Sequence, residues 1–174
     1  LQSTPQLIHK ILLTQEKKIK RLAKKYNKRN VFYFLGRGIN TATAYEGQLK
    51  LLEIAYIHCA AYPAGESKHG PISLVEKGFP VIFIAPKDKT HKTIIGNIHE
   101  MKARGAKTIG IIEENDQELI DLLDDYIEIP ANIPEVVSPI LNVIPLQLFA
   151  YYMALERGRD PDKPRNLAKS VTVL

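Results

Sequence analysis

The sequence predicts an α/β protein, a three-layer α/β/α sandwich built around a parallel sheet. Three short apolar runs, at residues 31–35, 80–85 and 107–112, have the length and the continuous hydrophobicity of strands that are buried on both faces. Segments with helical periodicity separate these runs, and strands that alternate with helices are typical of a parallel sheet covered on both sides. The sequence contains no internal repeat and no low-complexity segment.

The first third of the chain is expected to form a long helix, a strand and the start of a second helix. Pro5 suits the first turn of a helix, which we expect to span about residues 4–26. A polar link at 27–30 leads into the strand at 31–35. A glycine-rich turn ends that strand, and a helix of mixed charged and apolar residues follows.

The remaining elements alternate in the same way. After the strand at 80–85 we expect a helix at 89–104, a strand at 107–112, a short helix at 117–123, a weak strand at 126–129 and a long helix from Pro134 to about Arg157. Pro145 lies inside that last helix, where proline removes a hydrogen bond, so we expect the helix to be bent or to begin later. From Gly158 onward the chain is expected to form an irregular tail.

Composition indicates a soluble globular protein of one domain. The 174 residues are 45% hydrophobic and 25% charged. No apolar run approaches the length of a membrane span and no signal peptide is visible, so we expect a cytoplasmic protein without a membrane partner. Cys59 is the single cysteine, which fits a reducing compartment and a packing role. The histidines are scattered, so we expect neither a metal site nor a cofactor.

The net charge of +5 comes mainly from the first predicted helix, where eight basic side chains crowd residues 17–29. A basic stripe attracts phosphate backbones, but this one lacks the interleaved aromatic residues and glycines of a single-strand binder. An apolar face lies opposite the lysines. We therefore favour a solvated helix face and expect no nucleic-acid partner, although binding that weakens steeply with salt would reopen that interpretation.

The turn after the first strand has two possible meanings. Gly36 and Gly38 are followed by Thr41 and Thr43 at the entrance to the next helix. A strand, a glycine-rich turn and a helix N-terminus together present backbone N–H groups to a phosphate. However, two glycines without a third are a weak dinucleotide signal, and any α/β protein needs small residues at such a turn.

The helix that follows this turn carries a charged stripe. Glu46, Lys50 and Glu53 are separated by four and three residues, so they fall on one narrow side of the helix. Apolar residues cover most of the remaining circumference, which predicts a buried helix, and a buried carboxylate is costly unless it is partnered. The spacing alone favours a structural interpretation, in which Glu46 and Lys50 pair and Glu53 extends the network on a solvated face.

A loop is expected after this helix. It carries Glu66, Lys68 and His69 between Gly65 and Gly70, and together with the charged stripe it holds the groups that acid–base chemistry requires. His69 by itself is more often a loop histidine with an ordinary hydrogen bond than a catalyst.

Four motifs connect these segments to one family. FLGRG, EGxLKxxE, GExKHGP and PRNLAKSVTV occur in this order along the chain. The chain resembles the carboxy-terminal part of the glutamine–fructose-6-phosphate aminotransferases (isomerising), also called glucosamine-6-phosphate synthases, and in particular their second sugar-isomerase (SIS) subdomain. The resemblance implies a flavodoxin-like SIS domain at 29–157, a leading helix and link at 1–28 and a catalytic tail at 158–174.

The resemblance also assigns roles to individual residues. Enzymes of this family convert fructose 6-phosphate and glutamine-derived ammonia to glucosamine 6-phosphate. Lys169 matches the lysine that forms a Schiff base with the ketose, and Glu53 matches the carboxylate that moves a proton between the first two carbons. His69 matches the histidine that opens the sugar ring and reaches into the neighbouring subunit of a homodimer. Glu46 and Lys50 match supporting or proton-shuttling positions.

Four further positions are expected to bind substrate: Ala168, Arg165, Gly36 and Gly38. A Schiff base requires a neutral amine, so the pKa of Lys169 must fall through desolvation or nearby positive charge, and Arg165 is a suitable neighbour. The chain begins with Leu1 and lacks the family's glutaminase domain and first SIS subdomain, which holds the sugar phosphate, so we expect a fragment with little or no activity alone. A sugar-phosphate-binding regulatory module is the alternative function, but it has no evident use for the NLAKS tail.

Overall fold

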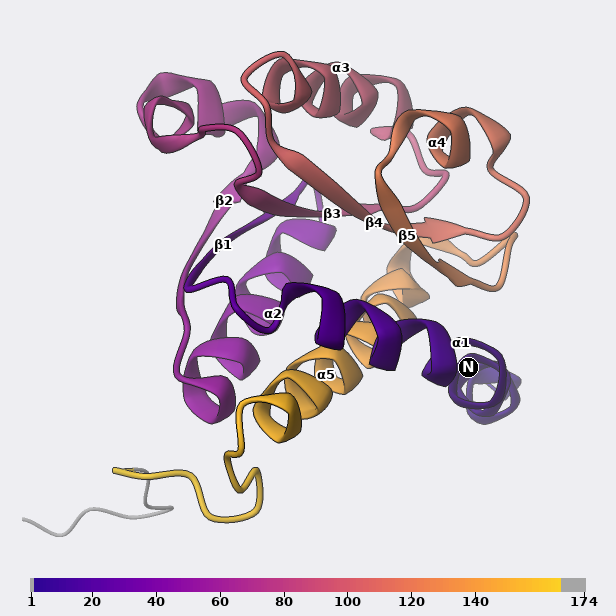
Figure 1. Cartoon of the computed structure of the whole chain (residues 1–174). Helices are drawn as coiled ribbons and strands as arrows, with labels where there is room; N and C mark the ends of the chain where they lie inside the picture. The colour runs from indigo at the N-terminus through magenta and orange to yellow at the C-terminus, as the bar shows by residue number, and fades with distance from the viewer. Residues whose placement is uncertain (1, 167–174) are drawn as a thin grey trace, which may run out of the picture.

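Five parallel strands form one sheet between two layers of helices in the computed structural model, which describes residues 2–166 (Figure 1). The strands are β1 (Val31–Gly36), β2 (His58–Pro63), β3 (Pro80–Ala85), β4 (Lys107–Glu113) and β5 (Asp125–Ile129). Their order in the sheet is β2-β1-β3-β4-β5, and every neighbouring pair is parallel. This is the flavodoxin-like order, so the predicted fold class is confirmed.

The helices cover the sheet unequally. One face carries the three long helices α1 (Thr4–Tyr26), α2 (Asn40–Ala55) and α5 (Ser138–Glu156). The other face carries α3 (His91–Lys102), α4 (Gln117–Leu122) and the short 3-10 helices η1 (Ala64–His69) and η2 (Pro71–Leu74), while η3 (Glu135–Val137) precedes α5. The predicted bounds of α1 are those observed.

The apolar runs form strands because helices shield both faces of the sheet from solvent. In β1, Phe32 and Phe34 belong to the core beneath α1, α2 and α5, whereas Tyr33 and Leu35 belong to the core beneath α3. All four side chains are buried. A strand that is buried on both sides needs no alternation of polar and apolar residues, which is why it reads as a continuous apolar run.

The segment after α2 was predicted as a loop, and this prediction was wrong. Residues 58–63 form β2, an edge strand that pairs only with β1, and the two 3-10 helices follow it. The sequence HCAAYP is short, and its two buried residues, Cys59 and Ala61, are both small. An edge strand has one neighbour and one covered flank, so its sequence carries less hydrophobic signal than a central strand.

The last helix was expected either to be bent or to begin later than Pro134, and it begins later. Residues 135–137 form the 3-10 helix η3, α5 starts at Ser138, and Pro145 lies within it. The stretch Glu135–Glu156 has 22 residues and contains an 18-residue window with a mean hydropathy of 1.4, which is enough to cross a membrane by length and composition. The statement that no apolar run approaches this length was therefore wrong. Just over half of that window is buried, and α5 packs against α1 and α2 as a core helix.

The turn between β1 and α2 leaves no room for a side chain at Gly36. A Cβ atom there would lie 2.3 Å from the backbone oxygen of Asn40. We predict that Gly36→Ala lowers the free energy of unfolding by about 1–3 kcal/mol, because the backbone of α2 must move away. Urea denaturation measures this.

Gly96 provides the matched control for this substitution. It lies inside α3, and no atom outside its own helix lies within 4 Å of the position a Cβ would take. Gly96→Ala should raise the free energy of unfolding by about 0.5–1 kcal/mol through helix propensity. Equal effects of the two substitutions would contradict the close approach at Gly36.

Candidate active site

Helix α2 carries the charged stripe as a linked set of ion pairs. Lys50 Nζ lies 2.8 Å from Glu53 Oε2 and 3.5 Å from Glu46 Oε1. The side chains of Glu46, Lys50 and Glu53 are 39%, 30% and 25% exposed, respectively. The network predicted from the spacing is therefore present. Glu53 is its least exposed member, and a partly buried carboxylate with a single lysine partner retains lone pairs for another ligand.

The ion pairs determine the charge of Lys50. Its pKa is raised, first by the hydrogen bond to Glu53 and then by the charges of Glu46 and Glu53, which outweigh the opposing effect of partial burial. A lysine with a raised pKa stays protonated at neutral pH and is not a nucleophile. Lys50 therefore acts as a cation that holds two carboxylates together, and it does not have the neutral amine that a Schiff base needs.

The expectation that α2 is buried nearly all round was wrong. Leu49 and Leu52 are 41% and 40% exposed, and Tyr45 is also exposed. The sheet and α5 cover the opposite side of the helix, where Gly47 and Leu51 lie. Within residues 2–166, α2 thus has one packed side and one open side, and the open side carries apolar residues beside the charged stripe.

A buried polar cluster fixes the position of α2 against α5. The fully buried Asn40 donates from Nδ2 to Ser138 Oγ at 3.0 Å. Its Oδ1 accepts hydrogen bonds from Asn142 Nδ2 at 2.9 Å and from Thr43 Oγ1 at 3.2 Å. These bonds join the first turn of α2 to the first two turns of α5 and allow little sliding between the helices.

Glu53 lines a cleft of about 440 Å³ at the C-terminal end of α2. The other lining residues are Leu52, Tyr56, Ile57, His58, Arg165 and Asn166. The cleft is large enough for a sugar phosphate. Because α2 runs antiparallel to the strands, Glu53 lies about 20 Å from the start of the helix, beside the first residue of β2. The cleft therefore lies at the amino edge of the sheet, not at the carboxyl edge where ligands of α/β folds usually bind.

The tail returns to α2 at this cleft. The backbone N–H of Arg165 donates to Tyr56 Oη at 2.8 Å, and the Arg165 guanidinium lies 4.2 Å from the centre of the Tyr56 ring. Arg165 and Glu53, two of the predicted site residues, are thus brought to one cleft. Lys169 and Ala168 lie outside the described residues, so their predicted roles stay predictions.

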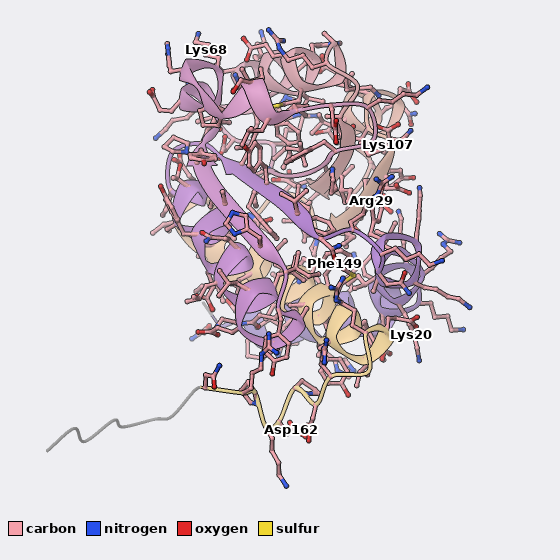
Figure 2. The ribbon with its side chains drawn as sticks, turned by 60° about the vertical axis from the view of Figure 1, so that its left-hand side comes forward. Lys20, Arg29, Lys68, Lys107, Phe149 and Asp162 are labelled. Carbon is pink, nitrogen blue, oxygen red and sulfur yellow. The ribbon has the colours of Figure 1, made fainter. Side chains whose placement is uncertain are left out.

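His69 lies elsewhere. It is exposed at the end of η1 and lines a second cleft of about 460 Å³, together with Arg37, Gly65, Glu66, Lys68, Lys92, Thr93, Gly96, Asn97 and Glu100. Figure 2 shows Lys68 of this loop and Asp162 of the tail at opposite ends of the molecule. The structure therefore does not bring His69 to the cleft that Glu53 lines.

The geometry of the turn accounts for its glycines. Gly38 has a φ of 54°, which side chains rarely adopt, and Gly36 is in contact with the backbone of α2. The backbone N–H groups of Asn40, Thr41 and Ala42 already donate to the carbonyls of the three preceding turn residues, at 3.1 to 3.3 Å. The structural interpretation of this turn is thereby strengthened, and substrate binding by Gly36 and Gly38 remains a prediction.

The basic residues of α1 are partly used for packing. Lys10, Lys18 and Lys25 pair with Glu114, Glu128 and Asp125 near the β5 edge of the sheet. Cys59 is buried, and burial raises the pKa of its thiol to about 12, in agreement with the packing role. Among residues 2–166, no group of three or more potential ligand side chains could hold a metal ion.

Two features were missed in the sequence. Tyr56 lies just beyond the end of α2, in the left-handed region. His91 Nε2 and Asp116 Oδ2 form a buried pair at 2.6 Å that ties the start of α3 to the cap of α4. Neither has a local sequence signal, because each depends on a contact between distant segments.

Comparison with known proteins gives a consistent result. Residues 25–157 match the SIS domain family. A curated relative from Pyrobaculum aerophilum, named glutamine–fructose-6-phosphate aminotransferase (isomerizing), is 52% identical over 173 residues, which are 99% of this chain and 28% of that protein. A relative of the same name from Thermus thermophilus is 48% identical over 171 residues, or 97% of this chain and 28% of that protein. The chain spans little more than a quarter of these relatives.

Solved structures share the fold. The C-terminal domain of glucosamine-fructose-6-phosphate aminotransferase from Francisella tularensis superposes with a TM-score of 0.86 at 34% identity, covering 93% of this chain and 45% of that one. Tagatose-6-phosphate ketose/aldose isomerase from Escherichia coli gives a TM-score of 0.78 at 21% identity, covering 95% and 46% of the two chains. The second likeness shows the fold alone.

The charge network makes a prediction that does not depend on any activity. Glu53→Gln should lower the pKa of Lys50, because the hydrogen bond to the Glu53 carboxylate is the largest cause of its increase. A pH titration of the lysine side-chain resonances by NMR measures the change.

Glu66→Gln is the matched control, since Glu66 lines the other cleft. The Lys50 pKa should not change in that variant. The ion pairs stabilise the fold by only about 0.2–1 kcal/mol, and this contribution is lost as the pH rises through the raised pKa of Lys50. An unchanged titration in Glu53→Gln would contradict the network.

Proposed function

Because the chain belongs to the SIS domain family, we propose that it forms the second sugar-isomerase subdomain of a glutamine–fructose-6-phosphate aminotransferase (isomerising). In this function it acts within a longer polypeptide that converts fructose 6-phosphate and glutamine-derived ammonia to glucosamine 6-phosphate. The main observation behind this proposal is the cleft that is lined both by Glu53, which pairs with Lys50, and by residues of the tail that precedes Lys169. The high identity to relatives of that name over nearly the whole chain supports the same proposal.

The proposed chemistry begins at Lys169. Its neutral amine adds to the C2 carbonyl of the opened ketose, and water leaves to give a Schiff base. Ammonia then displaces the lysine nitrogen at C2. The positive charge of Arg165, four residues earlier, favours the neutral form of a nearby amine. No cofactor is needed for these steps.

Glu53 performs the isomerisation in this proposal. Its carboxylate removes a proton from C1 of the protonated imine, which gives an enaminol. The same carboxylate returns the proton to C2, and the hydroxyl group on C1 loses its proton, so that C1 becomes the aldehyde carbon and C2 carries the amine. One carboxylate on one face of the sugar is sufficient for both transfers. Lys50 holds the carboxylate in place, and Glu46, on the other side of Lys50, supports this ion pair.

A homodimer completes the site. Histidine side chains can both take and give a proton, as ring opening requires. However, His69 lines a different cleft from Glu53. Figure 2 shows its neighbour Lys68 at the opposite end of the subunit from Asp162 of the tail. We therefore assign His69 to the site of the neighbouring subunit. The separation of the two clefts and the exposure of His69 at the end of η1 support this assignment.

Further domains supply the remaining functions. Both α2, at Leu49 and Leu52, and α5, at Tyr151 and Leu155, expose large apolar side chains, and the first SIS subdomain is proposed to cover them. That subdomain would hold the sugar phosphate, and a glutaminase domain would supply ammonia. The assembly is proposed to act in the cytoplasm.

Two variants separate the two chemical roles in the intact polypeptide. Borohydride reduction in the presence of fructose 6-phosphate should trap a sugar adduct on Lys169, which peptide mapping locates. Lys169→Arg should abolish trapping and turnover. Glu53→Gln should retain trapping but lower turnover by at least 10²-fold, because the proton transfer loses its base.

The control for this experiment is Glu118→Gln on α4, because Glu118 is exposed and lines neither cleft, so trapping should be unchanged. Bound sugar without any adduct on Lys169 in the unaltered polypeptide would overturn the Schiff-base role. If Glu53→Gln also turns over normally, a regulatory sugar-phosphate-binding module would be the better description.

The 174 residues alone are predicted to bind fructose 6-phosphate at least tenfold more weakly than the intact polypeptide, since the phosphate-holding subdomain is absent. Isothermal titration of both proteins with the sugar phosphate measures this difference. Efficient formation of glucosamine 6-phosphate by the 174 residues with added ammonium would contradict it.

A further inference from the structure

Tyr56 ends α2 in a conformation that tyrosine rarely adopts. Its φ of 56° and ψ of 43° lie in the left-handed region, where glycine or asparagine usually closes a helix. A side chain with a Cβ atom costs about 1 kcal/mol more than glycine in this region. The contacts of the Tyr56 side chain offset this conformational cost.

The side chain of Tyr56 holds the returning tail at two points. Its hydroxyl oxygen accepts the backbone N–H of Arg165 at 2.8 Å, and its ring lies beneath the Arg165 guanidinium at 4.2 Å. The guanidinium of Arg159 lies 5.5 Å from the same ring. Arginine over an aromatic face is attracted by the ring quadrupole. Both ends of the segment 159–165 are therefore fastened to one side chain.

This attachment lies beside the reactive groups of the proposed site. Tyr56 follows Glu53 by three residues and lines the same cleft, together with Arg165 and Asn166. The segment 158–166 makes no helix or strand that could fix its course by itself. The contacts with Tyr56 thus help to fix the course of residues 159–166, and Lys169 follows Arg165 by four residues in the sequence.

We propose that Tyr56 is a positioning residue that fastens the tail to the end of α2 and so sets the position of Lys169 relative to Glu53. This inference rests on the proposed function, which assigns Schiff-base formation to Lys169 and proton transfer to Glu53. The phenol oxygen fixes the main chain, and the ring fixes the guanidinium groups. Tyr56 itself does not touch the reacting carbons in this account.

The two contributions can be separated by substitution in the intact polypeptide. Tyr56→Phe keeps the ring and removes the acceptor for the Arg165 N–H. Tyr56→Leu removes both. Tyr62→Phe is the matched control, because that ring packs against Tyr33 in the core beneath α3.

Hydrogen exchange followed by mass spectrometry tests the attachment without reference to activity. Peptides covering 159–166 should exchange about tenfold faster in Tyr56→Phe and faster still in Tyr56→Leu, while the rest of the chain is unchanged. Tyr62→Phe should leave these peptides as they are. Unchanged exchange in Tyr56→Leu would overturn the inference.

Kinetics test the consequence for the reaction. We expect Tyr56→Phe to lower kcat about tenfold and Tyr56→Leu about a hundredfold, with KM for fructose 6-phosphate changed less than threefold. Borohydride trapping on Lys169 should slow in the same order. A structural role alone would reduce the amount of folded protein and leave kcat per folded molecule unchanged.

The outcomes distinguish this inference from the proposed function. If the unaltered polypeptide forms no adduct on Lys169, the proposed function fails, and the hydrogen exchange still decides whether Tyr56 holds the tail. If the adduct forms but the Tyr56 variants trap and turn over normally despite faster exchange, the positioning role is overturned.

Discussion

The contact between α2 and α5 is the constraint on which the rest of the structure depends. Asn40 is fully buried and binds Ser138, Asn142 and Thr43, so the start of α2 is held in a fixed register against α5. A buried polar group that loses its partners costs about 1–3 kcal/mol, and this cluster therefore tolerates little displacement. After this first turn, one side of α2 packs against the sheet and α5, and the opposite side is exposed.

The direction of α2 follows from the fold and decides where the chemistry lies. In a parallel sheet the connecting helix runs back antiparallel to the strands, so a residue near its end lies at the amino edge of the sheet. Glu53 and Tyr56 are there, next to the returning tail, whereas Arg37 and His69 line a cleft at the carboxyl edge. The chain thus carries two separate clefts at opposite edges of the sheet. This separation is the physical reason for proposing that a second subdomain and a second subunit complete each site.

Much of the fold could be predicted from local patterns. The bounds of α1 followed from Pro5 and the apolar periodicity, and β1, β3 and β4 followed from their dry, continuous apolar runs. The edge strand β2 could not be predicted, because one neighbour leaves little hydrophobic signal. The open side of α2 was missed for a related reason: helical periodicity shows which residues are apolar, but not whether a partner covers them.

The site was predictable only in part. Spacing predicted the ion pairs of Lys50, and the resemblance pointed to Glu53, His69 and Lys169. Neither could predict that Tyr56 leaves the helix and binds Arg165, since this contact joins residues that are 109 positions apart in the sequence. The separation of His69 from Glu53 likewise became visible only when the two clefts were located in the structure.

A crystal structure of the intact polypeptide with bound glucosamine 6-phosphate would test the central claim most directly. Our account predicts that C1 and C2 of the sugar lie within hydrogen-bond distance of the Glu53 carboxylate, in the cleft between Tyr56 and the tail. Sugar bound instead between Arg37 and His69 of one subunit, with Glu53 engaged only by Lys50, would contradict it.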